Sequence, residues 1–188
     1  MGHKQLVLLR GINLGAVNKV PMPALRTELD AAGLGGGGGV RTYLQSGNVM
    51  VQCNLPTDEL AALLHGIVLE KWGVDAPVVV RDVDELAAVV DGNPFPELAA
   101  AHPKQYQVSF LSEVIAGPGR ELLARRQQMG DTVAISDDGR EVYAWHPGGI
   151  HVSKLASQLS EKKLGVSAVT ARNWTTVLAC QGLLDARQ

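Results

Sequence analysis

The order of helices and strands that the sequence predicts is the same in both halves of the chain, and this repetition limits the possible folds more than any other feature. In the first half, apolar runs and helical periodicity predict a strand, a helix, a β-hairpin, a helix, a strand and a helix, at residues 4–9, 21–33, 40–53, 57–73, 77–81 and 82–90. The second half repeats this order at residues 105–111, 117–130, 132–145, 153–165, 166–170 and 171–184.

Strand, helix, two strands, helix and strand in this order make the ferredoxin-like βαββαβ unit. We therefore predict an α+β protein formed by tandem duplication of this unit, with a helix added to each copy. The expected domains are an N-terminal unit at 1–91, a linker rich in proline and glycine at 92–104, and a C-terminal unit with a closing helix at 105–188.

Composition narrows the class of protein. The chain has 188 residues, of which 46% are hydrophobic and 19% charged, as in an ordinary globular protein. The formal net charge of −2 argues against a protein that binds extended nucleic acid, because such proteins usually have a basic domain or stripe. The apolar runs are too short for a signal peptide or a membrane span, so we expect a cytoplasmic protein that does not bind membranes.

The sequence predicts no metal and no cofactor. Cys53 and Cys180 fit no metal or redox spacing and are expected to be reduced core thiols. His146 and His151 lack an evident third ligand, so a surface or hydrogen-bonded pair is the better interpretation. The glycine run at 34–40 lacks the following Lys-Ser or Lys-Thr of a phosphate-binding loop and is interpreted as a flexible connector. Catalytic residues stay unknown, because no nucleophile and base stand out as a pair.

The predicted topology brings polar residues from two distant segments to one edge of the first sheet. At this edge the end of the first strand, the start of the first helix and the tip of the hairpin meet. The candidate ligand-binding residues there are Arg10, Asn13 and Lys19 from the loop, and Gln45, Ser46 and Asn48 from the hairpin. Arg10 and Lys19 would supply charge to an anionic ligand, while the loop glycines let the backbone approach it. A plain connector whose asparagines cap turns is an equally good interpretation.

A second polar cluster is expected where residues 146–154 meet residues 170–174 at an edge of the second sheet. Its candidate ligand-binding residues are Ser153, Lys154, Arg172 and Asn173. Arg172 and Asn173 are predicted in the first turn of a helix capped by Thr170, where amides and a guanidinium could hold an anion. In the alternative interpretation, Asn173 and Thr170 only satisfy the helix start while Trp174 packs in the core.

Five ordered segments resemble an uncharacterised bacterial family that is known only as a domain of unknown function. They are LLRGINLGAVNKVPM, VRTYLQSGNVMV, GGIHVSKL, EKKLGV and TARNWTTV. The resemblance implies an α+β fold made by duplication of a ferredoxin-like unit, and it implies no activity. It also implies that the ten candidate residues belong to recurrent motifs. Two positions depart from the family pattern: Ala16 stands where glycine is frequent, and Val152 stands where arginine is frequent.

Three classes of function remain open from the sequence. The leading hypothesis is a cytoplasmic binding protein for an anionic or phosphate-bearing ligand, such as a nucleotide or a short nucleic-acid segment. The first alternative is a small enzyme with its site in a cleft between the two units, where His151, Ser153 and Lys154 would face the first cluster. The second alternative is a protein-interaction module that uses an open sheet face or edge. The ligand, any reaction and the oligomeric state are not determined by the sequence.

Overall fold

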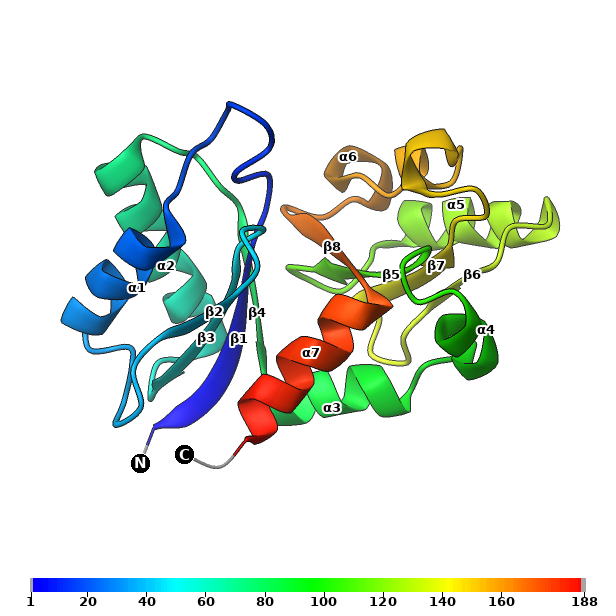
Figure 1. Cartoon of the computed structure of the whole chain (residues 1–188). Coiled ribbons are helices and arrows are strands. Elements are labelled where there is room, and N and C mark those ends of the chain that lie inside the picture. The colour runs from blue at the N-terminus through cyan, green and yellow to red at the C-terminus, as the bar shows by residue number, and fades with distance from the viewer. Residues whose placement is uncertain (1, 187–188) are drawn as a thin grey trace. The chain divides into compact units, whose positions relative to one another are not determined.

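The computed structural model describes residues 2–186 and divides into two compact units (Figure 1). Unit 1 contains the residues up to Ala87 together with those from Ala179 onward, and unit 2 contains Ala88–Leu178. The division falls within two helices, α3 (Val83–Asp91) and α7 (Trp174–Asp185). The sequence did not predict that residues after 178 join the first unit. The expected linker at 92–104 contains helix α4 (Pro96–Ala101) and belongs to unit 2.

Unit 1 has a four-stranded antiparallel sheet in the order β2-β3-β1-β4. Its strands are β1 (His3–Leu9), β2 (Arg41–Tyr43), β3 (Asn48–Cys53) and β4 (Val78–Asp82). Helices α1 (Met22–Ala31) and α2 (Thr57–Trp72) cover one face of this sheet (Figure 1). The order along the chain, β1-α1-β2-β3-α2-β4, is the order predicted from the sequence.

An aliphatic core holds the sheet of unit 1 against its helices. Strand alternation places Val7 and Leu9 of β1 on the covered face, beside Val49 of β3. Leu25 and Leu64, from the two helices, pack into the same core and are fully buried. Each such side chain contributes about 1.5–3 kcal/mol when removed from water, so this core fixes the edge of the sheet from which the candidate loops emerge.

Unit 2 also has a four-stranded antiparallel sheet, in the equivalent order β6-β7-β5-β8. Its strands are β5 (Tyr106–Leu111), β6 (Val133–Ile135), β7 (Glu141–Trp145) and β8 (Val169–Asn173). Helices α5 (Gly117–Gln128) and α6 (Glu161–Leu164) and two 3₁₀ turns, Ile150–Val152 and Ala156–Gln158, complete it. Its core includes Leu111, Leu123, Val142 and Leu164.

Residues 153–165 do not form the single helix that the sequence predicts. They form only the second 3₁₀ turn and the four-residue helix α6. The Ser153 hydroxyl accepts a hydrogen bond from the backbone of Ala156 (3.2 Å), and the Ser157 hydroxyl donates one to the carbonyl of Lys154 (2.7 Å). Such local side-chain bonds compete with a continuous helix, which explains the wrong prediction.

The closing helix also begins later than predicted. Arg172 and Asn173 lie in strand β8, where Asn173 pairs with Gln107 of β5, and α7 starts at Trp174. The Asn173 side-chain oxygen accepts a hydrogen bond from the backbone N–H of Thr176 (2.9 Å). Asn173, and not Thr170, therefore caps the helix.

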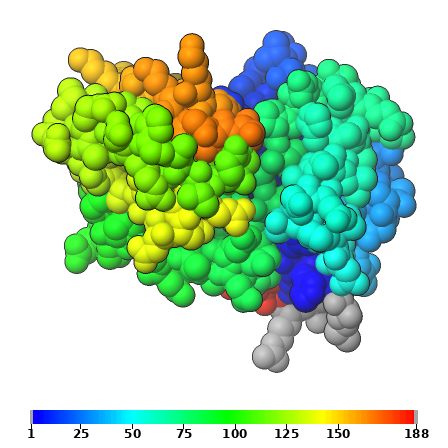
Figure 2. All heavy atoms as spheres, turned by 180° about the vertical axis from the view of Figure 1, so that it is seen from behind, coloured from blue at the N-terminus to red at the C-terminus, as the bar shows by residue number. Residues whose placement is uncertain are grey.

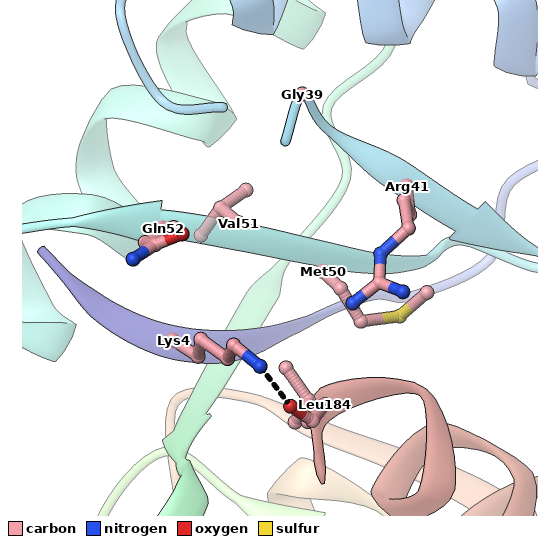
Figure 3. Close-up of a pocket in the computed structure, with 7 residues that line it drawn as sticks. All are labelled: Lys4, Gly39, Arg41, Met50, Val51, Gln52 and Leu184. Atoms are coloured by element: carbon pink, nitrogen blue, oxygen red, sulfur yellow. Dashed lines mark hydrogen bonds between the residues drawn. The ribbon is translucent and has the colours of Figure 1, made fainter. Parts of the chain in front are cut away.

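Two basic side chains of the first sheet hold the last turn of α7 (Figure 3). Lys4 Nζ donates hydrogen bonds to the carbonyls of Leu184 (2.6 Å) and Ala186 (3.0 Å), and the Arg41 guanidinium donates to the carbonyl of Leu183. The last carbonyls of a helix have no partner within the helix, and cations interact favourably with its C-terminal dipole. Lys4 and Arg41 thus attach residues 183–186 to the sheet of unit 1.

We expect Lys4→Met and Arg41→Met each to lower the free energy of unfolding by about 1–2 kcal/mol, because each variant leaves helix carbonyls without a charged donor. Amide hydrogen exchange should also become faster in the last turn of α7. Lys104→Met, at an exposed lysine, is the control and should change stability by less than about 0.5 kcal/mol. Unchanged exchange in α7 would contradict the attachment.

Candidate functional site

The loop that follows β1 is folded tightly upon itself. The backbone N–H of Asn13 donates to the carbonyl of Asn18 (2.9 Å), and Leu14 forms an isolated bridge with Val17. The Asn18 side chain donates to the carbonyl of Gly11 (2.9 Å). The loop stands out from the body of unit 1 as a blue projection (Figure 1, Figure 2). These bonds give it one defined shape.

Asn13 ties this loop to the turn between β2 and β3. Its side-chain nitrogen donates to the carbonyls of Val20 (2.9 Å) and Gln45 (2.8 Å), and its side-chain oxygen accepts from the N–H of Val20 (2.9 Å). A second bond between the segments runs from the N–H of Leu9 to the carbonyl of Gly47 (2.9 Å). The two segments that the sequence predicted to meet at one sheet edge are therefore in direct contact. We call the surface made by residues 10–19 and 43–47 the loop platform.

Asn48 supports the loop platform from below. Its side chain is completely buried and donates to the carbonyl of Tyr43 (2.9 Å) and to the hydroxyl of Ser46 (3.1 Å). A buried amide with these partners shapes the turn and does not itself face solvent. We therefore assign Asn48, like Asn13, a positioning role.

The backbone of the loop platform is strained. Among residues 2–186, the non-glycine residues with a positive φ are Asn13 (54°), Asn18 (51°) and Leu44 (58°), and all three lie on the platform. The left-handed conformation costs a leucine roughly 1–2 kcal/mol, whereas asparagine adopts it with less strain. Gly11, Gly15 and Gly47 adopt positive φ on the platform without this cost.

The loop platform carries positive charge and no acidic residue. Arg10 and Lys19 lie within residues 8–22, and neither that range nor residues 40–53 contains an aspartate or glutamate. Lys19, Gln45 and Ser46 are exposed, and Arg10 is half-buried. A surface of this kind favours an anion even though the chain as a whole has a net charge of −2.

In the second cluster, the structure pairs Ser153 with His146, which the sequence analysis had grouped with His151. His146 Nδ1 lies 2.8 Å from the Ser153 hydroxyl, whereas His151, the expected neighbour, is exposed. The pairing depends on residues 147–152 turning back, with Gly148 and Gly149 at φ 79° and 101°. The Pro-Gly-Gly sequence was a turn signal, but it does not reveal which side chains the turn brings together.

The other residues of the second cluster are engaged in local contacts or exposed. The Arg172 guanidinium donates to the Thr170 hydroxyl and to the carbonyl of Ala171, both at 2.8 Å, and Lys154 is exposed. The backbone N–H of His146 donates to the carbonyl of Gln105 (3.0 Å). The backbone N–H of Trp174 donates to the carbonyl of Pro103 (3.0 Å). Both segments of the cluster therefore reach the chain that leads into β5, as the predicted topology requires. Trp174 is buried, as expected.

His146 is 1% exposed, and this burial lowers its pKa below the ordinary value of 6.5, while the Asp131 carboxylate opposes the shift. The imidazole is thus neutral near pH 7 and can share a hydrogen bond with Ser153 in either direction.

Within residues 2–186 no three His, Cys, Asp or Glu side chains are grouped so as to hold a metal ion, and no helix there is long and apolar enough to cross a membrane.

A pocket at the opposite end of the first sheet is lined by Lys4, Arg41, Gln52 and Leu184, among others (Figure 3). Both of its basic groups bind α7 carbonyls, so we interpret this pocket as part of the helix attachment.

The two antiparallel sheets and their helices define an α+β protein, and comparison with known proteins gives its family. The chain belongs to the family described as protein of unknown function (DUF1697), which matches residues 3–143. This confirms the resemblance seen in the sequence. The match includes the loop platform and stops before residues 146–174 of the second cluster.

The solved structure of the conserved bacterial protein SP0830 from Streptococcus pneumoniae is similar to this protein. The similarity covers 98% of this chain and 100% of that one, with a TM-score of 0.68 and 19% sequence identity. At this identity the similarity shows a shared fold and no shared function. No curated protein matches the chain significantly.

We expect Gly47→Ala to lower the free energy of unfolding by about 2–4 kcal/mol, because the left-handed strain adds to crowding. A Cβ there would lie 2.8 Å from Leu9 Cβ and 3.0 Å from Ile12 Cδ1. Gly15→Ala is the matched control: its φ is also positive (57°), but its Cβ meets no atom within 4 Å. It should cost only about 1–2 kcal/mol, measured by urea denaturation. Equal losses in the two variants would show that the Leu9–Gly47 contact is not tight.

His146 should make the protein less stable in mild acid. Because its pKa is lower in the folded state than the ordinary 6.5, the unfolded chain binds more protons below about pH 6.5, and stability falls as the pH decreases. His146→Asn, which keeps a hydrogen-bonding group near Ser153, should flatten the unfolding free energy between pH 7.5 and pH 5. His151→Asn, at the exposed histidine, should leave the slope as in the wild type. An unchanged slope in His146→Asn would show that this imidazole is not buried in the neutral form.

Proposed function

We propose that this protein binds an anionic, phosphate-bearing ligand at the loop platform, such as a nucleotide or a short nucleic-acid segment. The observation that carries the proposal is the strained backbone at Asn13, Asn18 and Leu44. Residues held in such conformations persist only when the surrounding structure fixes them, and they concentrate at active sites and ligand clamps. Among the three, Leu44 is the residue type least suited to a left-handed backbone.

The charge of the platform and the bonds that pre-organise it support the same function. Arg10 and Lys19 can contact an anion, and Lys19 makes no hydrogen bond or ion pair with any residue of the described chain, so it loses none on binding. Asn13 joins the two segments before a ligand arrives, which lowers the entropy cost of ordering them. Two basic side chains suit a small ligand, whereas extended nucleic acid would need a longer basic surface.

We also infer that the fold arose by duplication of a ferredoxin-like unit. The sheet orders β2-β3-β1-β4 and β6-β7-β5-β8 are equivalent, and β1-α1-β2-β3 has its counterpart in β5-α5-β6-β7. The cytoplasmic location stays a prediction from the sequence.

An enzymatic function is the second candidate, and one observation favours it. The buried, neutral imidazole of His146 lies within hydrogen-bond distance of the Ser153 hydroxyl, the relation that a serine nucleophile has to its base. The Ser153 oxygen also accepts from the N–H of Ala156, so a purely structural role explains the same contacts. Covalent labelling of wild-type protein by a fluorophosphonate, and its loss in Ser153→Ala, would support the enzyme; an unlabelled wild type would remove this candidate.

To test the proposed binding, the protein is titrated with inorganic tripolyphosphate and with ATP by calorimetry at low salt. Lys19→Ala and Arg10→Ala should each weaken binding by about 5–10-fold, equivalent to about 1–1.4 kcal/mol per lost charge contact. The control Lys104→Ala, an exposed lysine of unit 2, should bind as the wild type does. If both probes bind but Lys19→Ala and Arg10→Ala leave their affinities unchanged, the ligand does not bind at the loop platform.

A further inference from the structure

The loop platform exposes three large aliphatic side chains next to its basic residues. Leu14 is 63% exposed, Val17 is 60% exposed and Leu44 is 58% exposed. The bridge between Leu14 and Val17 keeps these two residues together. Asn13, which precedes Leu14, donates a hydrogen bond to the carbonyl of Gln45, which follows Leu44. The three exposed side chains therefore come from two segments of the platform that are bonded to each other.

Leu44 is unfavourable for folding in two respects. Its side chain is mostly in water, so it contributes little to the core, and its backbone has a φ of 58°, where glycine or asparagine would be less strained. A leucine here raises the free energy of the folded state and, with 58% of the residue exposed, gains little from burial. An external contact of its side chain would explain why it is present.

Gln45 adds hydrogen-bonding capacity beside this apolar surface. Its side chain is exposed, and its amide makes no hydrogen bond with other described residues. A side-chain amide offers both a donor and an acceptor, which matches the edge of a nucleic-acid base and is of no use to an acyl chain. Aliphatic faces, one free amide and two nearby cations together fit a ligand with a flat heterocycle and a phosphate.

We propose that the ligand of the loop platform is a nucleoside phosphate whose base lies against Leu14, Val17 and Leu44, while its phosphates face Arg10 and Lys19. This inference rests on the proposed function and adds a residue that determines specificity. Leu44 supplies the apolar contact that separates a nucleotide from a bare polyphosphate, and Gln45 faces the edge of the base.

The test compares the binding of ATP and of inorganic tripolyphosphate to the wild type and to Leu44→Asn. In the wild type, ATP should bind at least about 5-fold more tightly than tripolyphosphate. In Leu44→Asn, this preference should disappear because ATP binding weakens, while the affinity for tripolyphosphate stays within about 2-fold. The same variant should melt about 2–4 °C higher, because asparagine tolerates the left-handed backbone better than leucine. Leu63→Gln, at another exposed leucine of unit 1, is the control and should leave the preference unchanged.

The outcomes separate the two proposals. Equal affinity of the wild type for ATP and tripolyphosphate, or an ATP preference that survives in Leu44→Asn, overturns the nucleoside assignment and leaves anion binding intact. If neither probe binds, the proposed function fails, and this inference fails with it. A preference for ATP that is lost in Leu44→Asn, together with weaker binding of both probes by Lys19→Ala, supports both.

Discussion

The side-chain amide of Asn13 is the interaction on which the candidate site depends. Its three hydrogen bonds join the loop after β1, the start of the chain that leads to α1, and the turn before β3. Without this amide, the backbone groups of Val20 and Gln45 would lose these partners, and the Leu9–Gly47 backbone bond would have to hold the two segments together. The platform is thus a property of the tertiary structure, because the loop supplies Arg10 and Lys19 while the turn supplies Leu44 and Gln45.

On the platform, asparagine side chains fix the backbone, and other side chains are exposed to solvent. Asn13 and Asn48 direct their polar atoms inward and fix the backbone, whereas Lys19, Gln45 and Leu44 point their side chains toward solvent. Gly47 lies where the chain crowds Leu9, whereas Gly11 and Gly15 only provide the positive φ. The strain of the left-handed residues is sustained by the aliphatic core beneath, which holds the sheet edge in place.

The sequence predicted the strand and helix order, and from it the meeting of the two platform segments, because hydrophobic periodicity reports directly which faces are buried. It did not predict the interrupted helix at 153–165, where serine side chains compete with the helix for backbone groups. Nor could it show that the side-chain amide of Asn48 is buried and hydrogen-bonded inside the protein, since a sequence gives the residue type and not the partner. The contact of His146 with Ser153 was missed for a related reason: it depends on how one turn folds back.

The attachment of α7 to β1 and β2 has a consequence for how the chain is made. Lys4 and Leu184 are 180 positions apart, and unit 1 includes the residues from Ala179 onward. A ribosome delivers the chain from its first residue to its last, so unit 2 is synthesised in full before unit 1 has all its parts. During translation, Lys4 and Arg41 cannot bind the carbonyls of α7 until the final turns of this helix have been synthesised. Strand β1 therefore completes its native contacts long after it has paired with β3 and β4.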